Sequence, residues 1–167
     1  AEAGRELEGG PRAPLRHLLA FLDSLDGDEL AAYRAAAARL GERVVLTGRL
    51  EHDELAPLLA ACEAQVVPST FPEAFGMVAA EAAAAGCPPL VARHSGLAEI
   101  AGGLEAEYPA RLAHLAAFES GSVDDLRLKL GELLTLSPGD REELRAAARR
   151  AVEARWSWAS VAQRLLV

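Results

Sequence analysis

The 167-residue chain has little of several residue types that mark particular classes of protein. It contains no asparagine, and hence no glycosylation sequon, and its two cysteines, Cys62 and Cys87, form no CxxC motif or Cys/His cluster. Neither a disulfide framework nor a zinc site is expected, and both thiols are predicted to be buried in a reducing compartment. The sequence shows no signal peptide and no apolar run of about 20 residues, so we predict a cytoplasmic protein.

Positive charge is also scarce. Only Lys129 among the 17 basic residues is a lysine, and the formal net charge is -8. This balance argues against partners such as nucleic acid, which needs a basic face, or an anionic membrane surface. An acidic chain that binds a phosphate group must supply positive potential locally.

The remaining composition is that of a globular protein, with 51% apolar and 25% charged residues. Residues 1–13 are polar and glycine-rich, and leucines recur at helical spacing over 15–25. We interpret 1–27 as a linker or helical insertion segment and 28–167 as the main domain.

Short apolar runs alternate with helical segments along the main domain. The runs that predict strands cover 43–47, 64–67, 89–92 and 115–118. Helices are predicted over 28–40 (ended by Gly41), 53–62, 75–85, 97–101, 123–136, 138–155 and from 158 onwards. Apolar strands that alternate with helices predict an α/β fold, a Rossmann-like parallel sheet of about four strands flanked by helices.

Ligands of open parallel sheets bind at the carboxyl ends of the strands. Two loops are predicted there, residues 47–50 and residues 68–76. The second leads into a helix N-terminus, which offers free N–H groups and partial positive charge. Gly76 would let a ligand approach the backbone, so this loop could bind phosphate without a lysine.

Two carboxylates flank this helix start, Glu73 before it and Glu81 within it, with seven residues between them. Each carboxylate could accept hydrogen bonds from the neighbouring hydroxyls of a sugar or a ribose. The residues alone leave other interpretations open. Glu81 could be exposed or paired with an arginine, and Glu73 could cap the helix.

The longer pattern around these acids closely resembles the donor-site motif of retaining GT-B glycosyltransferases (glycosyl transferases group 1). It comprises Pro68-Ser69, the run from Glu73 to Ala82, Gly86-Cys87-Pro88, Val91-Ala92 and Gly96-Leu97-Ala98-Glu99. Residues 43–50 resemble the preceding strand and loop of the family, and Ser157-Trp158 with Val161-Ala162 resemble its closing helix. The resemblance covers roughly residues 28–167.

The resemblance implies a role for each matching residue. Glu73 would be the catalytic-site acid that contacts the hydroxyls of the transferred sugar, and Glu81 would accept the ribose hydroxyls. The backbone amides of Phe75, Gly76, Met77 and Val78 would hold the sugar and the diphosphate. Gly48, Arg49 and Leu50 would lie beside the base. The donor would be a nucleotide-sugar, the acceptor is unknown, and no metal or other cofactor is expected.

The chain also departs from the family pattern. The Gly-rich loop that opens the donor domain, and the Arg and Lys that bind the diphosphate, have no counterpart. We therefore interpret the chain as an incomplete C-terminal domain, inactive alone, whose first strands and acceptor-binding N-terminal domain lie elsewhere, together with any membrane contact. His94 and Ser95 could line the sugar pocket or be satisfied within their loop, and Glu99 could be a ligand or a helix-turn residue. His17, His52 and His114 are predicted to be surface or packing residues.

Two other functions remain open. The missing diphosphate residues would suit a catalytically inactive Rossmann-like scaffold or interaction module. A different doubly wound protein, such as a phosphosugar-binding or signalling domain, is disfavoured because the chain lacks GxGxxG and GK[ST] motifs.

Overall fold

The computed structural model describes residues 15–166, which divide into two compact units, one ending at Arg49 and one beginning at Leu50. The first unit contains α2 (Arg16–Ser24), α3 (Gly27–Ala38) and α4 (Leu40–Arg43). Asp26 opens α3 with a capping box, since its side chain accepts from the Glu29 amide. Phe21 and Tyr33 pack edge to face across α2 and α3. The predicted linker over 1–13 lies outside the described residues, and the boundary between residues 27 and 28 stays a prediction.

Two expectations for the first unit are wrong. Gly41 does not end the helical region, because it lies inside α4. Residues 44–47 form no strand, and the side chains of Val45 and Leu46 are 84% and 89% exposed. An apolar run becomes a strand only when a neighbouring strand pairs with its backbone. No strand within residues 15–166 pairs with this run.

The second unit, which we call the sheet unit, contains three parallel strands in the order β1-β2-β3. They are β1 (Gln65–Val67), β2 (Pro89–Ala92) and β3 (Ala117–Phe118). Val91 of β2 is in register with Val67 on one side and Ala117 on the other. The α/β class with a parallel sheet flanked by helices is confirmed, with three strands where about four were predicted.

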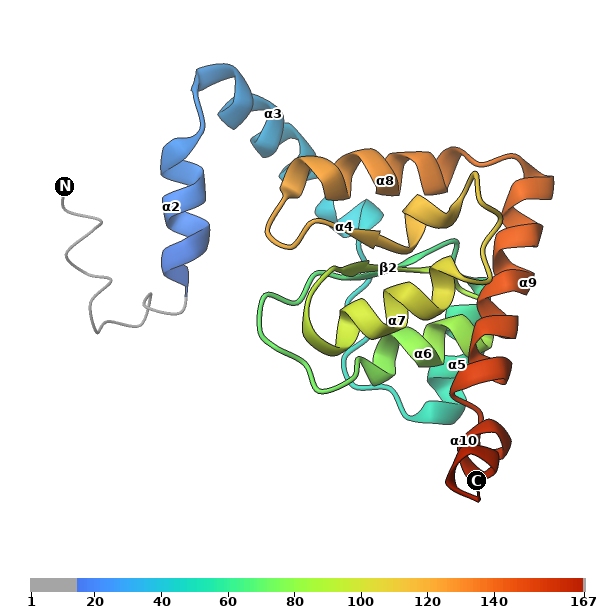
Figure 1. The fold of residues 1–167 in the computed structure, drawn as a ribbon. Coiled ribbons are helices and arrows are strands. Elements are labelled where there is room, and N and C mark those ends of the chain that lie inside the picture. Colours follow the sequence, from blue (N-terminus) through green and yellow to red (C-terminus); the bar gives the residue numbers. More distant parts are fainter. Residues whose placement is uncertain (1–14, 167) are drawn as a thin grey trace. The chain divides into compact units, whose positions relative to one another are not determined.

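Helices surround this sheet, with α6 and α7 on one side of the strands and α8 on the other (Figure 1). Their bounds are α5 (His52–Ala61), α6 (Met77–Ala85), α7 (Ser95–Glu105), η2 (Ala113–Ala116), α8 (Val123–Thr135), α9 (Pro138–Arg155) and α10 (Trp158–Leu165). The serines 122, 137 and 157 cap α8, α9 and α10 through their hydroxyl groups. None of the helices within residues 15–166 combines the length and apolar character needed to cross a bilayer.

The core of the sheet unit lies between the strands and the helices that pack on them. All four residues of β2 are buried, which agrees with a strand covered on both faces. Alanines on α6 and α9 allow these two helices to pack closely. Cys87 is fully buried and Cys62 is partly exposed, and burial raises the pKa of the Cys87 thiol to about 11. Cys87 is therefore a protonated packing residue at neutral pH.

Helix α7 is longer than predicted, since it runs through Gly102 and Gly103 to Glu105. A Cβ atom on Gly103 would lie 2.6 Å from the ring of Trp156. Gly103 therefore gives Trp156 room to pack on α7 and does not end the helix. This contact fixes the end of α9 against the helix that starts at the candidate site.

Candidate functional site

The loop between β1 and α6 meets the helix at Gly76, which occupies the N-cap position with φ +98°. This left-handed conformation favours glycine. A Cβ atom on Gly76 would also lie only 2.6 Å from Cδ2 of Leu97. Backbone conformation and close packing against α7 both explain why a glycine stands at this point of the motif.

The start of α6 presents a row of amide groups that have no hydrogen-bond partner in the described chain. Within residues 15–166, the N–H groups of Phe75, Gly76, Met77 and Val78 donate no hydrogen bond. Met77 and Val78 are 61% and 47% exposed, whereas Phe75 is half-buried and Gly76 is buried, so the last two residues of this row are open to solvent. No side chain caps α6, and the interpretation of Glu73 as its cap is wrong. The resulting positive potential at a helix start suits an anionic or strongly polar ligand.

Glu73 is held in front of this helix by its main chain. Its N–H donates to Ser95 Oγ at 2.9 Å, and its carbonyl accepts from the Gly96 N–H at 2.9 Å. The half-buried Glu73 side chain has no hydrogen-bond or ion-pair partner in the described part of the chain. Its carboxylate is therefore available to hydroxyl groups of a ligand.

The Phe75 side chain points to a different part of the molecule. Its ring packs edge to face on Trp156, with centroids 5.8 Å apart. A pocket of about 370 Å³ lies beside this pair and is also lined by Met77, Glu99, Trp158, Val161 and Arg164. The ring of Phe75 thus anchors the loop, and its nitrogen lies against Gly96 of α7, where an added Cβ atom would be 2.4 Å away.

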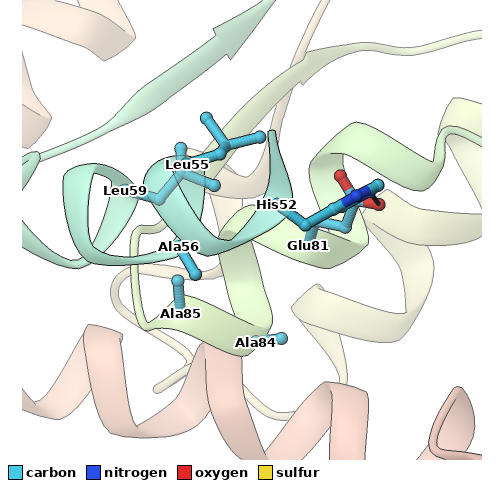
Figure 2. Close-up of a pocket in the computed structure, with 7 residues that line it drawn as sticks. All are labelled: His52, Leu55, Ala56, Leu59, Glu81, Ala84 and Ala85. Atoms are coloured by element: carbon cyan, nitrogen blue, oxygen red, sulfur yellow. Dashed lines mark ion pairs between the residues drawn. The ribbon is translucent and has the colours of Figure 1, made fainter. Parts of the chain in front are cut away.

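Glu81 lies one turn further along α6 and faces α5. Its Oε1 is 3.7 Å from Nε2 of His52, and the two side chains lie alongside each other in Figure 2. They border a pocket of about 340 Å³ whose other lining residues are Leu55, Ala56, Leu59, Ala84 and Ala85. The partner of Glu81 is therefore a histidine and not an arginine. Sequence reasoning missed His52 as a neighbour of the site, although it closely follows the predicted loop 47–50.

The three residues predicted beside the base fall on both sides of the unit boundary. Gly48 and Arg49 end the first unit, where Gly48 has φ +69°. Leu50 begins the sheet unit and is half-buried. Their role at the base stays a prediction.

Cationic side chains of the sheet unit are engaged in bonds with other protein groups. Between residues 50 and 166, every arginine and Lys129 contacts a carboxylate or a backbone carbonyl. Lys129, for example, donates to the Ala117 carbonyl at 2.7 Å and pairs with Asp125 at 3.0 Å. The unbonded amides of α6 are a positive feature near Glu73, and Arg164, which lines the pocket beside Phe75 and Met77, is a cation near the same loop. Nor does the described chain group three or more His, Cys, Asp or Glu side chains in a way that could hold a metal ion.

These features define an α/β domain with a candidate polar site where the loop after β1 enters α6 at the edge of a parallel sheet. The model of the family described as glycosyl transferases group 1 matches residues 18–151. The chain therefore belongs to this family.

One relative carries a more specific description. An MMP alpha-(1->4)-mannosyltransferase from Mycolicibacterium hassiacum is 39% identical over 113 residues. The match includes 68% of this chain and 25% of that relative, so the matched region spans about a quarter of the relative's length.

Proposed function

We propose that this protein is a retaining glycosyltransferase of the GT-B type, and that the described residues bind its nucleotide-sugar donor. The observation that carries the proposal is the row of unbonded amides from Phe75 to Val78, with Glu73 on one side and Glu81 on the other. A row of donors flanked by two acceptors matches a ligand that has a diphosphate between two hydroxyl-bearing rings.

Each end of the donor has its own contacts in this proposal. Glu73 accepts hydrogen bonds from the transferred sugar, and Glu81 accepts them from the ribose. The backbone of Gly48, Arg49 and Leu50 lies beside the base. When the bond between the anomeric carbon and the diphosphate oxygen breaks, negative charge grows on the leaving diphosphate. The α6 amides stabilise that charge, so catalysis is largely electrostatic and needs no metal.

The remaining parts of the active site come from other residues of the protein. The engaged arginines and Lys129 leave the sheet unit without an evident cationic clamp for the diphosphate. We propose that an Arg and a Lys from another segment supply it, and that a separate N-terminal domain binds the acceptor.

A donor screen on the intact protein tests the function. Mannosyl donors come first, because the Mycolicibacterium relative is named a mannosyltransferase. We expect transfer from one nucleotide-sugar in the presence of EDTA, with the anomeric configuration of the product equal to that of the donor by NMR. A product of opposite configuration would contradict retention. Absence of both transfer and nucleotide binding would favour the scaffold alternative.

Glu81→Ala is expected to weaken binding of the matching nucleoside diphosphate by about 1–3 kcal/mol, because the ribose loses a charged hydrogen-bond acceptor. Alanine is favoured in a helix, so the fold should persist. Calorimetric titration of the intact protein measures the effect. Glu132→Ala is the matched control, since Glu132 also pairs with a histidine, His114, at 2.9 Å but on α8. Equal affinities in the wild type and Glu81→Ala would remove Glu81 from the donor site.

A further inference from the structure

Ser95, the first residue of α7, has an unusual backbone. Its φ is +43°, and among residues 15–166 it is the only non-glycine residue with a positive φ. The left-handed region is unfavourable for a residue with a Cβ atom, and glycine would adopt it without strain. A serine at such a position calls for a compensating interaction of its hydroxyl group.

The hydroxyl of Ser95 is bonded to the main chain of Glu73. Ser95 Oγ accepts from the Glu73 N–H at 2.9 Å, and the next residue, Gly96, donates to the Glu73 carbonyl at 2.9 Å. Both polar groups of the Glu73 backbone are therefore held by two consecutive residues at the start of α7. Because the Glu73 side chain has no partner of its own in the described chain, these two bonds set where its carboxylate can reach.

His94 is also part of this hydrogen-bond network, and it orients the hydroxyl group of Ser95. Its Nε2 is 2.6 Å from the Ser69 carbonyl, and its Nδ1 is 2.8 Å from Ser95 Oγ. A carbonyl only accepts, so Nε2 carries a proton, and in the tautomer with a proton on Nε2 alone the Nδ1 atom accepts from the Ser95 hydroxyl. In that tautomer the hydroxyl proton points at His94, and a lone pair of Oγ faces the Glu73 amide.

We propose that Ser95 is a positioning residue for Glu73. Its hydroxyl, oriented by His94, holds the acid in the place from which it contacts the transferred sugar. Glycine at this position would adopt the positive φ more easily but would lack this hydroxyl. This inference rests on the proposed function, since it assigns a role in the same donor site.

The variants Ser95→Gly and Ser95→Ala test the inference in the intact protein. Ser95→Gly relieves the strained φ, so its melting temperature should equal or exceed that of the wild type, whereas Ser95→Ala keeps the strain. Both lose the hydroxyl, and both should lower kcat about tenfold with little change in the donor KM. The KM is conserved because the ribose and diphosphate contacts do not involve Ser95. Ser120→Gly and Ser120→Ala are controls, since Ser120 is exposed and makes no hydrogen bond with the described residues.

Hydrogen exchange of the Glu73 amide, measured by NMR, separates this inference from the proposed function. Faster exchange in both Ser95 variants, with wild-type exchange in the Ser120 variants, supports the link. A Ser95→Gly protein with wild-type kcat, or with an unchanged Glu73 amide, would overturn it. If the wild-type protein transfers no sugar, the proposed function fails, and the exchange data still decide whether Ser95 holds Glu73.

Discussion

Gly96→Ala is expected to destabilise the protein by about 3 kcal/mol and to displace the loop that carries Glu73. A Cβ atom at this position would lie 2.4 Å from the Phe75 nitrogen and 2.6 Å from the Ala74 carbonyl carbon. These are backbone atoms, so the clash cannot be relieved by rotating a side chain. The loop must move away from α7, and the Gly96 hydrogen bond to the Glu73 carbonyl must lengthen or break.

Urea denaturation measures the stability change, and Gly102→Ala in the same helix is the matched control. Gly102 is exposed, and a Cβ atom there would meet nothing within 4 Å. Gly102→Ala should stabilise the protein by about 0.5–1 kcal/mol, since alanine is the better helix former. A Gly96→Ala protein as stable as the wild type would show that the loop and α7 do not pack as described.

Glu73→Gln is expected to lower kcat/KM for sugar transfer about 10- to 100-fold and to leave the fold intact. Glutamine keeps the size of the side chain but replaces a charged acceptor by a neutral amide, and hydrogen bonds to charged groups contribute about 1.5–3 kcal/mol. The half-buried carboxylate has no internal partner within residues 15–166, so its replacement should cost little stability. Steady-state kinetics with the donor identified by the screen measure the loss.

The control for this variant is Glu142→Gln. Glu142 is exposed on α9 and has neither an ion pair nor a hydrogen bond with the described residues. The Glu142→Gln variant should retain wild-type kinetics. This result would show that the loss of one negative charge does not by itself lower the transfer rate of this acidic protein. Wild-type transfer by Glu73→Gln would contradict the role proposed for this acid.

Local signals predicted most of the secondary structure. The pair Ser137-Pro138 predicted the start of α9, and Gly86 the end of α6, because capping depends on residues close in the chain. The wrong predictions concern segments whose secondary structure depends on residues far away in the sequence. Helix α7 continues through Gly103 because Trp156 packs there, and residues 44–47 form no strand because no strand within 15–166 pairs with them.

The candidate site shows the same division. The spacing of Glu73 and Glu81 and the glycine between them predict a candidate site from sequence alone, and their role there stays a prediction. The bonds that hold these acids connect residues 22 or more positions apart, as in the Glu73–Ser95 hydrogen bond. Periodicity and composition contain no information about such bonds. For this reason the closeness of His52 to Glu81 became visible only in the folded chain.

The engaged cations of the sheet unit have a consequence for how donor binding should depend on ionic strength. Dissolved ions screen exposed, widely separated charges, whereas dipoles that touch a ligand are little affected. In the proposed site, the contacts from the α6 amides to the ligand are of the second kind, and Glu73 and Glu81 are charged groups that would touch the ligand directly. Raising the salt concentration should therefore weaken the long-range attraction between the donor and exposed charges of the protein and leave the direct contacts, so that a salt titration separates these two contributions to donor affinity.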